Sequence, residues 1–296
     1  MPQAAVRLRS LGPGAVPVSA VGYGGMHLSL EGRPSAEEAF RVLHAAFDAG
    51  VTLVDTADVY CLDQHDIGHN ERLIAGALRS WSGPRERIVV ATKGGLVRPG
   101  GRWTTDGRPA QLRAACDRSL AALGVERLDL YQLHAPDPDV PFEESVGALA
   151  RLREEGKVRW IGLSNVSVDQ IERARGIVPI ESVQNRLNPF FREALASGVV
   201  AHCAALGLGF LAYSPTGGGR LTLKLPAHPV LQPMAARLGV TAHALVLAWV
   251  LSRSPTVIAI PSARRVEHAL DSISAAELEL SPEDLSLIDR AEFSRA

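Results

Sequence analysis

Residues 35–56, SAEEAFRVLHAAFDAGVTLVDT, hold the pattern of one complete helix and of the strand that follows it. Ser35 and Glu38 have the spacing of a capping box, which predicts that a helix begins here. Its buried face and its end are marked by Phe40, Leu43, Phe47 and Gly50. Residues 52–54 are β-branched or apolar, and residues 52–56 predict a buried strand. A helix that leads directly into a buried strand is typical of an α/β fold.

The same alternation of strand and helix patterns continues along the chain. Eight strands are expected, at residues 20–24, 52–56, 88–93, 128–134, 158–163, 182–186, 209–214 and 257–260. Eight such units in 296 residues match a single (β/α)8 TIM barrel, spanning 1–296, better than a Rossmann domain followed by a second domain. Residues 7–11 and 16–21 predict a β-hairpin that caps the N-terminal face of this barrel.

Composition limits the classes of partner. With 46% hydrophobic residues, the chain has enough apolar side chains for a folded core. Its 31 basic and 32 acidic residues leave no basic excess for nucleic acid or an anionic membrane. The three cysteines have no CxxC spacing, and no apolar run approaches the ~20 residues of a membrane span. These features indicate a cytoplasmic protein whose partner is a small molecule.

Titratable side chains stand at the ends of three consecutive expected strands. Asp55 and Tyr60 follow the second strand, Lys93 ends the third and His134 ends the fourth. In a barrel these ends meet at one rim, where active sites lie. A single Asp–Lys pair at a rim is typical of a solvated ion pair, but the four groups together favour an active site.

The chemistry expected of these groups is acid catalysis. A carboxylate would keep Lys93 charged, and that charge would lower the pKa of Tyr60. Tyr60 would then serve as a general acid near neutral pH. His134 would orient a substrate carbonyl by hydrogen bonding.

Nine short motifs, in order along nearly the whole chain, resemble those of the aldo-keto reductase superfamily. They are residues 22–26 (GYGGM), 55–60 (DTADVY), 70–71 (NE), 91–95 (ATKGG), 128–134 (LDLYQLH), 156–165 (GKVRWIGLSN), 184–185 (QN), 213–215 (YSP) and 260–264 (IPSAR). The resemblance implies an NADPH-dependent carbonyl reductase with Asp55, Tyr60, Lys93 and His134 as its catalytic residues. Tyr60 would protonate the carbonyl oxygen while the cofactor nicotinamide delivers hydride from C4.

The resemblance also implies the residues that contact NADPH or NADP+. Ser164, Asn165 and Gln184 would bind the carboxamide, and Tyr213 would stack on the nicotinamide. The turn at 214–219 offers hydroxyl and glycine N–H groups suited to a pyrophosphate. The remaining expected cofactor contacts are Gly25, Met26, Ser214, Pro215, Thr216, Gly217 and Gly218.

At the far end of the cofactor, Ser262 and Arg264, with Arg265 beside them, would contact the 2′-phosphate, because an arginine fork reads such an anion well. This favours NADPH over NADH. His268 and Asp271 match adenosine-contacting positions, whereas Ser272 stands where the resembled family commonly has Asn.

Met26, Trp103 and Phe190 follow strand ends and are expected to wall the substrate pocket. The loop Cys61 to His69 is longer than is usual in the resembled family. His65 and His69 stand four residues apart in it, which suits a metal, but no helix is signalled there. A polar loop is therefore favoured, and no metal is expected.

Two other functions stay open from the sequence. A strand-end lysine in a barrel can form a Schiff base, as in aldolases, although pairing with Asp55 would keep Lys93 protonated. Some members of the resembled superfamily act as non-catalytic, NADPH-binding regulatory subunits. The four expected catalytic residues argue against that function, and a single-turnover assay would separate the two.

Overall fold

The structure is a computed structural model that describes residues 7–296. Its centre is a parallel sheet in the order β12-β11-β10-β9-β8-β5-β4-β3. These strands are β3 (Tyr23–Gly24), β4 (Leu53–Asp55), β5 (Val89–Gly94), β8 (Leu128–Leu133), β9 (Val158–Ser164), β10 (Ser182–Arg186), β11 (Gly209–Tyr213) and β12 (Val257–Ala259). Val21 pairs with Ala259 across the two edges and closes the sheet. The expected (β/α)8 TIM barrel is confirmed, with one strand at each expected position.

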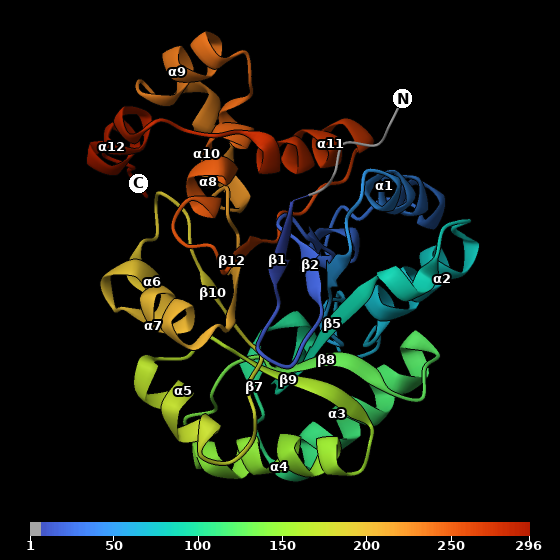
Figure 1. Ribbon diagram of the computed structural model, residues 1–296. Helices are drawn as coiled ribbons and strands as arrows, with labels where there is room; N and C mark the ends of the chain where they lie inside the picture. Colours follow the sequence, from blue (N-terminus) through green and yellow to red (C-terminus); the bar gives the residue numbers. More distant parts are fainter. Residues whose placement is uncertain (1–6) are drawn as a thin grey trace.

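Helices surround the barrel strands, as Figure 1 shows, and α9 to α12 gather along one side. The α-helices are α1 (Ala36–Asp48), α2 (His69–Ser80), α3 (Pro109–Leu123), α4 (Phe142–Glu154), α5 (Val168–Arg175), α6 (Glu193–Ala196), α7 (Val199–Leu206), α8 (Gly219–Thr222), α9 (Leu231–Leu238), α10 (Ala242–Leu251), α11 (Val266–Ser274) and α12 (Pro282–Arg290). The 3-10 helices are η1 (Met26–Leu28), η2 (Arg85–Arg87), η3 (Pro99–Gly101), η4 (Leu225–Ala227) and η5 (Ala275–Glu277).

The start of α1 shows how the local sequence sets the fold. The Glu38 backbone N–H donates to the Ser35 hydroxyl at 3.2 Å, and the Ser35 N–H donates to the Glu38 carboxylate at 2.9 Å. This is the expected capping box, which satisfies donors that the first helical turn leaves free. The helix buries Leu43 and Phe47 in the main core cluster. The sequence pattern of residues 35–56 is thus confirmed.

An N-terminal hairpin closes one end of the barrel. Its strands are β1 (Leu8–Ser10) and β2 (Pro17–Ser19). At its turn, Gly14 N–H donates to the Glu181 carboxylate at 2.7 Å and the Trp160 indole donates to the Gly14 carbonyl at 3.0 Å. Gly209, the first residue of β11, donates to the Leu11 carbonyl at 3.1 Å. The hairpin therefore covers the N-terminal strand ends, as expected, and leaves the opposite rim open.

The apolar core has two layers. Side chains inside the barrel form the first layer: Leu11, Val18, Leu53, Val89, Ala91, Leu130, Trp160, Leu211, Ile258 and Ile260. The second and larger layer lies between the strands and the surrounding helices. Within residues 7–296, no single helix is long and apolar enough to cross a membrane, although α9 and α10, bent by 93°, pass that test of length and composition as a pair.

A small hairpin after β5 is an element that the sequence pattern missed. It consists of β6 (Leu96–Val97) and β7 (Thr104–Thr105), paired antiparallel. Between them, η3 bends the chain, with Gly100 at φ 55° and Gly101 at φ 78° in the left-handed region that favours glycine. This hairpin brings Leu96 and Trp103 to the open rim of the barrel.

Candidate active site

The open rim brings together Asp55, Tyr60, Lys93 and His134. Asp55 is the last residue of β4, Lys93 lies near the end of β5 and His134 follows β8. The Lys93 ammonium donates to Asp55 Oδ2 at 2.7 Å, to the Thr56 carbonyl at 2.8 Å and to Tyr60 Oη at 2.9 Å. An ammonium has three N–H donors, so all three are used.

Burial decides the protonation of Tyr60. Removal from water raises the pKa of Tyr60 well above its ordinary value, and the nearby Asp55 carboxylate raises it further. The net shift is therefore upward, opposite to the lowering expected from the sequence, and the desolvation of a buried phenolate is its largest cause. Burial also lowers the pKa of Lys93, while the Asp55 carboxylate opposes that shift. Tyr60 is thus a phenol at neutral pH.

The hydrogen bond from Lys93 leaves the Tyr60 hydroxyl hydrogen available. Because Tyr60 Oη accepts from Lys93, its own O–H can donate to another acceptor. His134 stands edge-on to the Tyr60 ring, with centroids 5.8 Å apart. Burial and the Lys93 charge lower the pKa of His134 well below its usual range, so the imidazole is neutral. Its Nδ1 has no hydrogen-bond partner within residues 7–296. A phenol and a neutral imidazole therefore face one cavity.

This main cavity has a volume of about 630 Å3 and extends from Tyr60 and His134 to Arg264. It is lined by most of the residues expected to contact cofactor or substrate: Met26, Trp103, Ser164, Asn165, Gln184, Tyr213, Ser214, Pro215, Thr216, Gly218, Ser262 and Arg264. Gly219, in the turn expected to bind the pyrophosphate, also lines it. Other lining residues were not expected from the sequence: Gly24, His27, Leu96, Arg186, Thr222, Ile260 and Pro261. Those that directly neighbour an expected residue could have been found from the strand-end positions.

Seven expected residues do not line the main cavity: Gly25, Phe190, Gly217, Arg265, His268, Asp271 and Ser272. Phe190 is buried and packs edge-on against Phe293, with centroids 5.3 Å apart, so it does not wall the substrate pocket. The Asp271 carboxylate accepts from the Thr241 hydroxyl at 2.8 Å. Ser272 lines a separate small cavity beside Val21. Asp271 and Ser272 of α11 therefore contact groups outside the main cavity.

The amide side chains beside the main cavity connect with the catalytic group. Gln184 Nε2 donates to Asp55 Oδ1 at 2.7 Å. Asn165 Nδ2 donates to the His134 carbonyl at 3.0 Å, and the Tyr213 hydroxyl donates to Asn165 Oδ1 at 2.8 Å. Gln184 thus fixes Asp55 through its amide N–H, and its amide oxygen remains to accept from a ligand.

The turn after β11 has the backbone that its glycines allow. Gly217, Gly218 and Gly219 have φ values of 103°, 70° and 46°, in the left-handed region that side chains with a Cβ rarely adopt. Ser214, at φ 47°, also lies in that region. This conformation exposes backbone groups to the main cavity in a way that suits a phosphate.

Arg264 links two loops at the far end of the main cavity. Its Nε donates to the His27 carbonyl and its Nη2 to the Glu31 carbonyl, each at 3.0 Å. The Ser262 hydroxyl donates to the Gly24 carbonyl at 2.6 Å. One nitrogen of the Arg264 fork, Nη1, is left for another acceptor.

The two histidines of the loop at 61–69 face different partners. His65 Nε2 lies 2.9 Å from Gln64 Nε2, whereas His69 Nδ1 lies 2.8 Å from the Ser29 hydroxyl. In the described part of the chain, no group of three His, Cys, Asp or Glu side chains is placed to hold a metal ion. Cys61 is buried, and burial raises the pKa of its thiol to about 11. That thiol is therefore protonated and unreactive at neutral pH.

A barrel with these buried rim residues defines a class of oxidoreductases, and comparison with known proteins gives the family. The model of the aldo/keto reductase family matches residues 20–292. A probable aldo-keto reductase of Glycine max is 35% identical over 98% of this chain and 90% of its own length. The chain therefore belongs to the aldo/keto reductase family.

Solved structures agree with this assignment. An aldo/keto reductase from Klebsiella pneumoniae, solved in complex with NADP and acetate, has a TM-score of 0.80 at 28% identity, covering 96% of this chain and 95% of that one. A glycerol dehydrogenase from Gluconobacter oxydans has a TM-score of 0.82 at 29% identity, covering 98% of this chain and 95% of that one.

Proposed function

We propose that this protein reduces an aldehyde or ketone to an alcohol with NADPH, and that Tyr60 is the general acid. The observation that carries the proposal is the Lys93 ammonium, which donates at 2.9 Å to a phenol oxygen that burial keeps protonated. A protonated donor beside a fixed positive charge is what carbonyl reduction requires, because the carbonyl oxygen becomes negative as the reaction proceeds.

The main cavity fits NADPH. Gly218 and Gly219 after β11, Gln184 with its free amide oxygen and Arg264 with its remaining nitrogen all line this cavity. They offer partners for a pyrophosphate, a carboxamide and a 2′-phosphate, respectively. Tyr213 supplies a flat ring for the nicotinamide. The NADP complex of the similar Klebsiella reductase supports the same assignment.

Each catalytic residue has a separate part in the reaction. The bound cofactor supplies a hydride to the carbonyl carbon. Tyr60 transfers its hydroxyl proton to the carbonyl oxygen, and a proton from solvent later restores the phenol. Lys93 stabilises the phenolate that forms, and Asp55, held by Gln184, keeps Lys93 charged. His134 donates a hydrogen bond that positions the carbonyl.

The Schiff-base alternative conflicts with the surroundings of Lys93. Its side chain is 0% exposed and its three N–H donors are all engaged. A nucleophilic lysine needs a free, uncharged amine and access to the substrate carbonyl. The geometry therefore favours an electrostatic function for Lys93.

The decisive experiment is Tyr60→Phe. We expect turnover of a reactive aldehyde with NADPH to fall by about 10² to 10⁴-fold, the usual contribution of a general acid. NADPH affinity should stay within about twofold, because the ring still packs. Single-turnover loss of cofactor absorbance measures the chemical step and also tests the regulatory-subunit alternative. Half of the activity remaining in the variant would contradict the assignment.

Cofactor preference is tested by Arg264→Ala. We expect NADPH affinity to fall about tenfold or more, because a charge-assisted hydrogen bond to phosphate is lost. NADH, which has no 2′-phosphate, should bind almost unchanged. Tryptophan fluorescence quenching at constant salt measures both. Equal losses would mean that Arg264 acts by bridging the His27 and Glu31 carbonyls instead.

A further inference from the structure

A second cavity, of about 390 Å3, lies between the loop after β4, the hairpin after β5 and helix α3. We call it the Asp58 cavity. Its walls are mostly apolar, formed by Ile67, Leu96, Val97 and Pro99. Among residues 7–296, Leu96 alone lines both this cavity and the main cavity. The volume is within the range of small-molecule sites, about 300 to 1,000 Å3.

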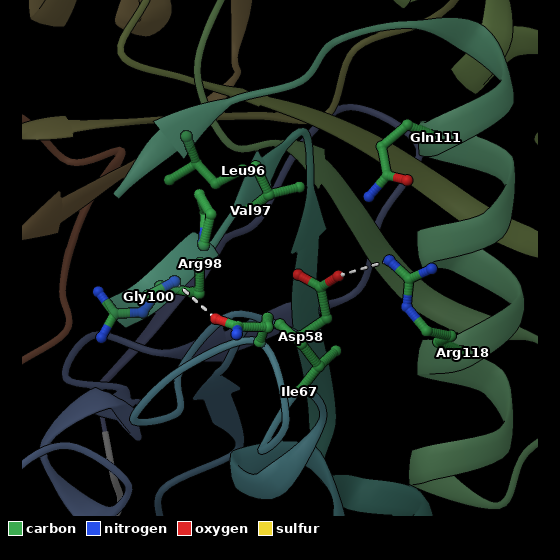
Figure 2. Close-up of a pocket in the computed structure, with 10 residues that line it drawn as sticks. Asp58, Ile67, Leu96, Val97, Arg98, Gly100, Gln111 and Arg118 are labelled. Atoms are coloured by element: carbon green, nitrogen blue, oxygen red, sulfur yellow. Dashed lines mark hydrogen bonds and ion pairs between the residues drawn. The ribbon is translucent and has the colours of Figure 1, made fainter. Parts of the chain in front are cut away.

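A buried carboxyl group forms the floor of the Asp58 cavity. Figure 2 shows the Asp58 carboxylate pointing into the space between Val97 and Arg118. Its side chain is 0% exposed, and Oδ2 lies 3.5 Å from Arg118 Nη2, a long contact for an ion pair. Oδ1 has no hydrogen-bond partner anywhere in the described chain. A buried carboxylate oxygen without a hydrogen-bond partner costs free energy, and a ligand that donates a hydrogen bond to Asp58 would recover part of that cost.

A second buried carboxyl group lies beside the first. Glu71 is 0% exposed, and its Oε1 accepts from the Thr92 hydroxyl at 2.5 Å. Burial and the Glu71 charge raise the pKa of Asp58 to about 8, although Arg118 opposes the shift. At neutral pH Asp58 therefore carries a proton.

Arg98, the second arginine that lines this cavity, does not pair with Asp58. The Arg98 guanidinium points away from Asp58 in Figure 2. Arg98 Nη2 donates to the carbonyls of Cys61 and Leu62, at 3.0 and 2.9 Å, and the group stacks on Trp103 at 4.0 Å. Arg118 is 43% exposed and can turn outward into solvent. One carboxylate with apolar walls suits an organic cation better than a metal ion, which needs several oxygen ligands.

We propose that the Asp58 cavity binds an organic ammonium ion with a short apolar chain. The ammonium donates to Asp58, and the chain packs on Ile67, Leu96 and Val97. Arg118 swings aside to admit it. Binding exchanges one cation for one proton: the ammonium enters, and Asp58 releases its proton to solvent. No covalent bond forms or breaks apart from that O–H bond.

The proposal predicts a pH dependence that other charges around Asp58 modulate. These are Glu71 on α2, Arg118 on α3, Lys93 on β5, Tyr131 on β8 and Cys61 on the same loop. Affinity should rise by up to about tenfold per pH unit towards pH 8, where Asp58 ionises, and then level off.

Calorimetry with n-butylammonium chloride tests the proposal on the full chain saturated with NADP+, so that the main cavity is occupied. We expect saturable binding, release of one proton at about pH 6.5 (measured in two buffers of different ionisation enthalpy), and at least about tenfold weaker binding of 1-butanol. Asp58→Asn should lower the affinity at least about tenfold and abolish proton release. Asp63→Asn, on the same loop, is the matched control and should bind as the parent does.

A variant that keeps Asp58 but fills the cavity, Val97→Trp, should also abolish binding, so the test does not depend on the folding of one variant. The proposal is overturned if butylammonium shows no saturable binding, if 1-butanol binds equally, or if Asp58→Asn binds with unchanged affinity. Because the readout is binding and proton release, failure here leaves carbonyl reduction untouched, and failure of Tyr60→Phe leaves this site untouched.

Discussion

Asp55 and Asp58 are two buried carboxyl groups on one segment of chain, yet their surroundings differ. Both Asp55 oxygens accept hydrogen bonds at 2.7 Å, from Lys93 and from Gln184. Asp58 has Arg118 at 3.5 Å and the Val59 backbone N–H, and its Oδ1 lacks a hydrogen-bond partner in residues 7–296. The strands hold the first group between two hydrogen-bond donors, whereas the second lies on a loop and has a long contact to Arg118.

Lys93→Met removes the ion pair between Lys93 and Asp55, and it should cause the largest loss of stability among the variants compared. It leaves the Asp55 carboxylate buried without a cation, which costs about 3 to 5 kcal/mol in the free energy of unfolding. Turnover should fall with it, because Tyr60 loses the donor at 2.9 Å. Urea unfolding and aldehyde reduction measure the two losses.

The control for this variant is Lys157→Met. Lys157 pairs with Asp117 at 2.6 Å, but the two side chains are 30% and 51% exposed. Such a pair contributes about 1 kcal/mol or less. If Lys157→Met destabilised the protein as much as Lys93→Met, burial would not be what distinguishes the Asp55 pair.

The sequence predicted the catalytic residues at the strand ends better than it predicted the Asp58 cavity, for a physical reason. Strand ends of a parallel barrel converge, so the positions of Asp55, Lys93 and His134 along the chain already implied that they meet. The Asp58 cavity depends on how α3 packs and on where the hairpin after β5 folds, which no local pattern states. Burial is a tertiary property too, which is why the expected direction of the Tyr60 pKa was wrong.

The same distinction applies to Phe190 and α11. Phe190 follows a strand end, but it packs against Phe293, about one hundred residues later in the chain, in a contact that spacing does not reveal. The direction in which α11 turns Asp271 and Ser272 depends on packing against Thr241 and Val21. Residues fixed by the strands were therefore predictable, and residues fixed by loop and helix packing were not.

Asp58→Asn tests whether the stability of the protein depends on pH through the protonation of Asp58. The pKa of Asp58 is about 8 in the folded chain against an ordinary 3.8, so between these values the folded protein binds a proton that the unfolded chain does not. The stability that a neutral Asp58 provides is complete below pH 3.8 and is lost as pH rises to about 8. Asn stays neutral throughout.

The free energy of unfolding of Asp58→Asn, relative to the parent, should therefore increase with pH across this window, by up to about 1.4 kcal/mol per unit. Urea unfolding at several pH values from about 5 to 8 measures the difference. A difference that does not change with pH would show that Asp58 is ionised throughout, as a fully paired carboxylate would be.

Arg118→Gln should cause the smallest loss of stability, and the size of that loss should depend on whether Asp58 is protonated. At about pH 6 Asp58 carries its proton, so a partly exposed arginine at 3.5 Å has little charge to pair with, and the loss should stay below about 1 kcal/mol. As pH rises towards 8 the loss should grow, because Arg118 lowers the pKa of Asp58 and its removal makes ionisation more costly. Urea unfolding at both pH values measures the change. A loss at pH 6 comparable with that of Lys93→Met would mean that the two carboxylates are equally charged, and that the contrast between them lies in their position alone.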